Sequence, residues 1–177
     1  MQLLRQAEQL TRAYETLAQL LALDPQDDDL IYEQAMLADR LKRHEDMERL
    51  LRQILQRDSK HVQANNALGY SLADRGERLD EARRLIQTAL EGAPGDPFIT
   101  DSLGWVEFRL GRTAEALKLL RQAHGTRPDP EIAAHLGEVL WVSGQREQAR
   151  SVWDAALKVD PSNEVLRETV QRLAAGR

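Results

Sequence analysis

The sequence contains no cysteine, few aromatic residues and no long apolar run. Without cysteine there can be no disulfide framework and no thiolate metal site. No stretch approaches the roughly 20 apolar residues that a membrane-spanning helix needs. The formal net charge is -5, and no basic stripe with interleaved aromatics offsets it, which argues against nucleic acid as a partner. The absence of cysteine is compatible with an oxidising compartment but does not establish one.

Small residues, by contrast, recur along the chain with a period of about 34 residues. Each period contains two glycines seven residues apart, then two alanines seven residues apart, then a proline. Three such units are present: Gly69, Gly76, Ala82, Ala89 and Pro94; Gly104, Gly111, Ala116, Ala123 and Pro128; Gly137, Gly144, Ala149, Ala156 and Pro161. Three units with nearly the same spacing indicate a repeat array. In such an array we expect a partner-binding surface instead of an active site.

Each unit is expected to form two helices, as residues 96–128 illustrate. Asp96 followed by Pro97 predicts a helix start, with a side-chain cap and a proline where no amide partner is lost. Gly111 predicts the end of that helix, and Thr113 is expected to cap the next one. The remaining glycine and the alanines are expected where two helix backbones approach too closely for a larger side chain.

This combination of size, order and spacing resembles the tetratricopeptide repeat (TPR) over essentially the whole chain. The resemblance implies an all-α fold: a right-handed superhelical array of antiparallel helix pairs, a TPR solenoid of about five repeats plus a C-terminal capping helix. We divide the single domain 1–177 into a truncated repeat (1–25), a degenerate repeat (26–59), three clear repeats (60–94, 95–128 and 129–161) and the capping helix (162–177).

The two ends of the array are less regular than its middle. In the degenerate repeat, Ala35 and Lys42 stand where the two glycines belong, and helices are still expected at about 28–41 and 44–57. Residues 2–10 are expected to extend the first helix, and the capping helix is expected at 164–174. Because the chain begins inside a repeat, we expect it to be part of a longer protein.

The resemblance also implies that the first helix of each pair lines a concave groove, with five positions per repeat pointing inward. Most of the aromatic residues fall on these positions, and aromatic anchors in a concave surface are typical of peptide recognition. Tyr70 and Trp105 are expected at the more exposed of these positions, whereas Phe108 and Trp141 also fit half-buried packing residues. The candidate partner-binding residues are Tyr32, Asn66, Tyr70, Phe98, Asp101, Trp105, Phe108, Arg109, Glu138 and Trp141.

We predict no catalytic residue, no cofactor and no metal site. Glu131, His135 and Glu138 share one helix face and could offer ligands to a metal, but a solvated helix face is the favoured interpretation. The acidic run 27–29 lacks the glycine and spacing of a calcium loop and is expected to start a helix. Glu107 replaces a large residue of the helix seam, and either snorkels to solvent or pairs with a nearby arginine such as Arg109 or Arg112.

Three segments show a closer resemblance: ALGYSLADRG at 67–76, DSLGWV at 101–106 and PDPEIAAHLGEVLW at 128–141. They are similar to the C-terminal repeats of proteobacterial outer-membrane TPR lipoproteins, over about residues 60–174. That resemblance implies a periplasmic scaffold or adaptor, tethered to the membrane through an anchor outside this sequence. The implied partners are a carboxyl-terminal processing protease and cell-wall hydrolases, and a cytoplasmic location is the alternative.

A second functional hypothesis is structural. The incomplete first repeat is expected to leave an apolar edge that includes Leu3, Leu4 and Leu10. Such an edge favours a homo-oligomer formed through the ends of the array or by exchanged helices.

Overall fold

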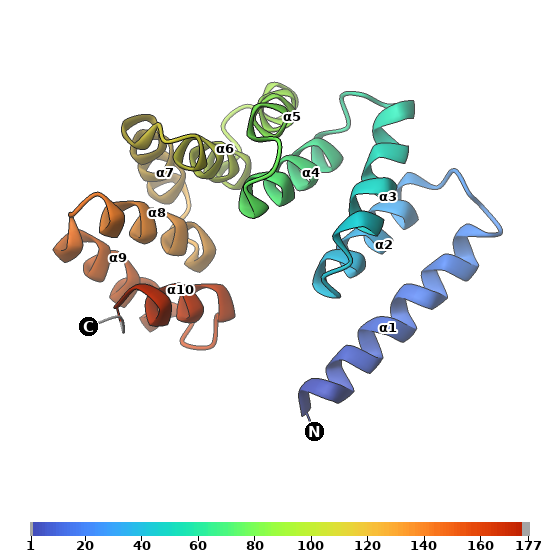
Figure 1. Cartoon of the computed structure of the whole chain (residues 1–177), viewed down its shortest axis with the longest axis horizontal. Coiled ribbons are helices and arrows are strands. Elements are labelled where there is room, and N and C mark those ends of the chain that lie inside the picture. The colour runs from blue at the N-terminus through green and yellow to red at the C-terminus, as the bar shows by residue number, and fades with distance from the viewer. Residues whose placement is uncertain (1, 175–177) are drawn as a thin grey trace.

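The computed structural model describes the backbone of residues 2–174 and the side chains of residues 7–174. This part of the chain is entirely helical, without strands, and its helices follow an arc whose two chain ends lie on the same side (Figure 1). The helices are α1 (Gln2–Leu21), α2 (Asp28–Arg40), α3 (His44–Arg57), α4 (Val62–Arg75), α5 (Leu79–Gly92), α6 (Pro97–Arg109), α7 (Thr113–Thr126), α8 (Pro130–Val142), α9 (Arg146–Val159) and α10 (Glu164–Ala174). The predicted all-α array of antiparallel helix pairs is thereby confirmed.

Local sequence explains where several of these helices begin. Asp96 caps α6 through its Oδ1, which accepts hydrogen bonds from the backbone amides of Phe98 and Ile99 at 2.9 and 3.0 Å. Asp27 caps α2 in the same way, as the acidic run predicts. Thr113 does not cap α7: Arg112 occupies the cap position, and no side chain accepts a bond there. The cap prediction was therefore wrong for this helix.

The turn inside each helix pair requires a left-handed backbone. Gly76, Gly111 and Gly144 adopt φ values of 71, 79 and 83° there. In the degenerate repeat the equivalent position is Lys42, which takes φ of 58° although it carries a side chain. The repeat geometry is therefore kept without glycine, at the cost of a backbone conformation that L-residues disfavour.

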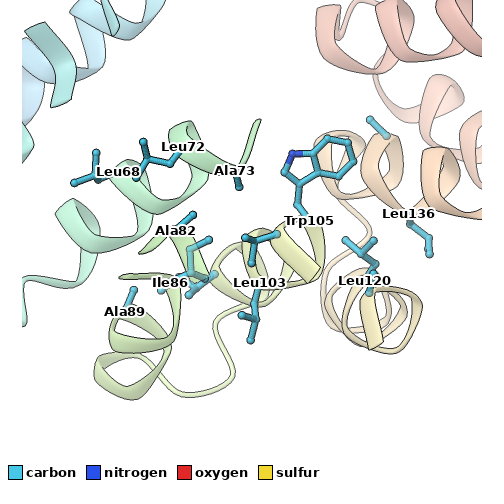
Figure 2. Packing of buried hydrophobic residues seen from close by; sticks show 14 of the residues in the cluster. Leu68, Leu72, Ala73, Ala82, Ile86, Ala89, Leu103, Trp105, Leu120 and Leu136 are labelled. Atoms are coloured by element: carbon cyan, nitrogen blue, oxygen red, sulfur yellow. The ribbon is translucent and has the colours of Figure 1, made fainter. Parts of the chain in front are cut away.

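The first glycine of each clear repeat lies where two helices touch. A Cβ atom built at Gly69 would lie 2.6 Å from Cγ1 of Ile86, and one built at Gly104 would lie 2.7 Å from Cγ of Leu120. At Gly137 the added atom would meet the indole ring of Trp153. The packing role predicted for these glycines is confirmed, and the seam beside them forms one continuous core, whose middle part Figure 2 shows.

The two ends close this core differently. At the C-terminal end, α10 packs on α8 and α9 and buries Leu166 completely, whereas the neighbouring Val165 is exposed. At the N-terminal end, α1 packs on α2, with Tyr14 buried and Leu10 half-buried. The side chains of Leu3 and Leu4 lie outside the described residues. Among the described helices, none combines the length and the apolar character that crossing a membrane requires.

Glu107 is a buried charge within the seam. It is 2% exposed, and its carboxylate accepts from Nε of Arg83 at 2.5 Å and from Nη1 of Arg112 at 3.1 Å. Of the two alternatives that the sequence left open, the second holds: Glu107 pairs with arginines, namely Arg83 and Arg112, and does not extend to solvent. Arg109 instead donates to the backbone carbonyl of Asp74, 2.5 Å away.

Candidate functional site

The concave side of the array contains a cavity of about 490 Å³ to which helices from both halves of the chain contribute. Its walls come from α2, α3, α4, α6, α8 and α10, so that four successive repeats and the capping helix meet there. The lining residues are Asp39, Lys42, His44, Met47, Tyr70, Ser71, Asp74, Arg75, Trp105, Glu131, His135, Glu138, Val165, Glu168, Thr169 and Arg172.

A chain of hydrogen bonds crosses three repeats at the wall of this cavity. The hydroxyl of Tyr70 on α4 lies 3.2 Å from Nε2 of His135 on α8, and Nδ1 of the same ring lies 2.8 Å from Oδ2 of Asp101 on α6. A carboxylate only accepts, so Nδ1 carries a proton. Nε2 then accepts from the phenol when the imidazole is neutral and donates to it when the imidazole is charged. Trp105 stacks on the imidazole with ring centroids 4.5 Å apart.

The electrostatic potential in this part of the groove is negative. Burial raises the pKa of Tyr70, and the carboxylates of Asp74, Asp101, Glu131 and Asp39 raise it further. Burial by itself lowers the pKa of His135, but Asp101 outweighs that effect, and the pKa lies above its ordinary value. Of the carboxylates that cause these shifts, Asp39, Asp74, Glu131 and Glu138 come from α2, α4 and α8 and line the same cavity.

Some of this negative charge is neutralised within the groove and some is not. Glu138 on α8 accepts from Arg172 on α10 at 2.6 Å, and Arg75 pairs with Glu77 at 3.0 Å on the rim. Between side chains of residues 7–174, the carboxylates of Asp74, Glu131 and Glu168 make no ion pair, and all three residues are exposed. Burial also raises the pKa of Glu131, with contributions from Asp129 and Asp101 and an opposing one from His135.

The structure brings together four of the residues predicted to bind a partner. Tyr70, Trp105 and Glu138 line the cavity, and Asp101 supports it through His135. The expectation that Trp105 is exposed was wrong: its side chain is only 5% exposed, because His135 stacks on one part of it and Phe108 packs 5.5 Å away. Trp105 therefore forms the wall of the groove instead of projecting freely from it.

The other predicted residues lie away from the cavity lining. Trp141 packs against α9, with its ring 5.6 Å from that of Trp153 and the guanidinium of Arg146 5.2 Å from its centroid. Phe98 is exposed near Arg127, and Arg109 is held by the backbone of α4. Tyr32, Asn66 and Phe108 are half-buried.

His135 and Arg172 are the functional candidates that sequence reasoning did not assign to the groove. His135 falls outside the inward-pointing positions of the repeat, and only the packing of α8 on α6 turns it toward Asp101 and Trp105. Arg172 lies on the capping helix, to which the repeat rule does not apply. Within the part of the chain that the structure describes, no group of three or more metal-ligating side chains converges, so Glu131, His135 and Glu138 do not form a metal centre.

The fold and the groove together define a helical-repeat scaffold. Two family models, both described as "Tetratricopeptide repeat", match residues 32–97 and 107–173. The chain therefore belongs to the tetratricopeptide repeat family, whose domains bind proteins or peptides and are generally non-catalytic.

Comparison with individual proteins agrees with this assignment. TPR repeat-containing protein PA4667 of Pseudomonas aeruginosa is 42% identical over 166 residues, which cover 94% of this chain and 28% of that protein. The chain thus spans between a quarter and a third of the length of this relative. The crystal structure of TTC0263, a thermophilic TPR protein of Thermus thermophilus, superposes with a TM-score of 0.81 at 21% identity over 97% of this chain and 92% of that one. MamA of Desulfovibrio magneticus RS-1 superposes with a TM-score of 0.69 at 14% identity over 88% of each chain. At these identities the two structures show a shared fold and nothing more.

Proposed function

We propose that this chain is a non-catalytic scaffold that binds a segment of a partner protein in its concave groove. The observation that carries the proposal is the convergence of Tyr70, Trp105, His135, Glu138 and Arg172 on one cavity. These residues come from four helices that lie far apart in the sequence. A concave site with rigid aromatic walls and a few fixed polar groups is the usual form of a recognition site.

Site-specific photo-crosslinking tests the groove. A photoreactive phenylalanine analogue is placed at Glu168, which lines the cavity, and in a second variant at Asp154, which is exposed on α9 outside it. We expect a partner adduct from the first position only, and loss of that adduct when Glu131→Lys reverses a charge on the same cavity. Circular dichroism confirms that each variant is folded. An adduct formed equally well from Asp154 would refute the groove assignment.

The intact protein is, in this proposal, an adaptor of the bacterial cell envelope that brings a carboxyl-terminal processing protease to cell-wall hydrolases. The support comes from the similarity of residues 67–76, 101–106 and 128–141 to outer-membrane TPR lipoproteins. Fractionation of cells that express the full reading frame tests the location. We expect the protein with the outer membrane, on the periplasmic side, and recovery in the cytoplasmic fraction would contradict the proposal.

Self-association is a second candidate function, and one observation favours it. Near the junction of α1 and α2, Leu20 is 43% exposed and Leu23 is 85% exposed. Large apolar side chains at the end of an array favour contact with a second copy. Light scattering across a concentration series is expected to show a dimer that Leu23→Gln weakens, and a monomer at all concentrations would rule this function out.

A further inference from the structure

We infer that the centre of the groove is a subsite for one positively charged side chain, a lysine or an arginine, of the bound segment. The inference rests on the proposed groove function and adds the chemistry of the ligand. It follows from the charges that line the cavity and from a buried donor in its wall that has no acceptor among the described residues.

Carboxylates from different helices line the cavity. Asp39 on α2, Asp74 on α4 and Glu131 on α8 all belong to its wall, and each raises the pKa of the Tyr70 phenol, which lines it as well. Asp39 has only a long contact with His44, at 3.7 Å. These carboxylates repel one another and gain from any cation that comes between them.

The cations of the lining do not balance this charge. Arg172 pairs with Glu138, and Arg75 pairs with Glu77. The remaining basic residues of the lining are Lys42 and, when protonated, His44 and His135, against the carboxylates of Asp39, Asp74, Glu131 and Glu168. The cavity therefore holds more negative than positive charge, and a cation that enters it relieves repulsion between the carboxylates.

A second, independent observation is that the indole N–H of Trp105 makes no hydrogen bond to the described residues. Nε1 of Trp105 has no hydrogen-bond acceptor among the described residues, although the side chain is only 5% exposed and lines the cavity. Figure 2 shows the ring projecting between α4 and α8, with its nitrogen on the side of α4. A buried donor without an acceptor destabilises the fold, so buried groups of this kind are normally paired.

An extended peptide supplies both missing groups. Its lysine or arginine side chain places a cation among the carboxylates, and its backbone carbonyls are acceptors for the indole N–H. The nitrogen is covered by its neighbours, so a carbonyl reaches it only when adjacent side chains move. An acidic segment would bring further negative charge beside Asp74 and Glu131, and an apolar segment would leave these carboxylates without a counter-charge. Charge complementarity thus selects a basic segment.

The three indole N–H resonances of the protein report directly on this subsite. The chain has three tryptophans, and Trp141 and Trp153 lie outside the cavity lining, so they serve as internal references. The 15N-labelled chain is titrated with a blocked alanine–serine heptapeptide that carries lysine at its centre, and with the matched arginine, norleucine and glutamate peptides. We expect a saturable shift of the Trp105 resonance with the two basic peptides only.

Two double variants measure how much the carboxylates of the cavity contribute to peptide binding. Asp74→Asn with Glu131→Gln removes two cavity carboxylates and is expected to weaken binding of the lysine peptide about threefold to tenfold. Glu147→Gln with Asp154→Asn removes the same charge from exposed positions on α9 and is expected to leave the affinity within about twofold, as for weak, distant charges. Since both pairs change the net charge equally, the comparison excludes a general electrostatic effect.

Three results overturn the inference. They are equal binding of the norleucine or glutamate peptide, equal weakening by both double variants, and no shift of Trp105 with either basic peptide. If no basic peptide shifts Trp105 while the crosslink from Glu168 persists, the cationic subsite is wrong and the groove function stands. If the crosslink is absent as well, both fail.

Discussion

The contact between α8 and α9 allows the most direct test of how the repeat is built. Gly137 faces the indole of Trp153, which is 1% exposed, and a methyl group added there would overlap three atoms of the ring. The ring is rigid and packs 5.6 Å from Trp141, so it cannot yield without displacing α9. In Gly137→Ala two effects compete: alanine favours the helix by about 1 kcal/mol, and overpacking costs typically 1–3 kcal/mol and occasionally more.

Because the overlap is with a rigid ring, we expect the overpacking cost to exceed the upper end of its usual range. The net loss of unfolding free energy is then about 2 kcal/mol or more, which lowers Tm by about 4–8 °C in a chain of this size. Gly125→Ala is the matched control, since Gly125 lies in the last turn of α7 with nothing within 4 Å of an added Cβ. The control is expected to be stabilised by up to about 1 kcal/mol, the gain in helix propensity alone.

Thermal and urea unfolding, followed by circular dichroism, measure both variants. The reasoning is refuted if Gly137→Ala is as stable as the unsubstituted protein. It is also refuted if both substitutions raise the unfolding midpoint, because the gain in helix propensity would then explain both.

Three further predictions follow from other parts of the seam and groove. Lys42→Gly removes a left-handed backbone strain and is expected to raise the unfolding free energy by about 0.5–1 kcal/mol in urea titrations; a loss would contradict the strain. Arg83→Ala leaves the buried Glu107 carboxylate with one partner and is expected to cost about 2 kcal/mol, whereas Glu107→Leu costs less because the arginines can reach solvent. The raised pKa of His135 means that its bond to Asp101 adds stability below the ordinary histidine pKa of about 6.5, and that this stability is lost as the pH rises through the raised value. Unfolding midpoints measured across that range are expected to show this decline, and Asp101→Asn is expected to abolish it; an unchanged decline in the variant would exclude His135 as its source.

The candidate site was only partly predictable from the sequence. The repeat rule places Tyr70, Asp101, Trp105 and Glu138 on the concave face, because each stands at an inward position of its own repeat. The rule says nothing about contacts between side chains. Such contacts bury Trp105 against His135 of the next repeat and turn Trp141 toward α9 of its own repeat. His135 was considered only as a metal ligand on one helix, since its partners stand 34 and 65 residues earlier in the chain.

The sequence alone determined the helical array and the small residues at its contacts. Periodic glycine, alanine and proline residues and the aspartate caps act over one turn or one repeat, and such local rules can be read along the chain. Only the tertiary structure decided what the groove contains. The curvature of the array sets which side chains from α2, α4, α6, α8 and α10 meet, and curvature accumulates from all the helix contacts at once. The line Tyr70–His135–Asp101, the unpaired indole of Trp105 and the excess of carboxylates are consequences of that geometry, which no single repeat encodes.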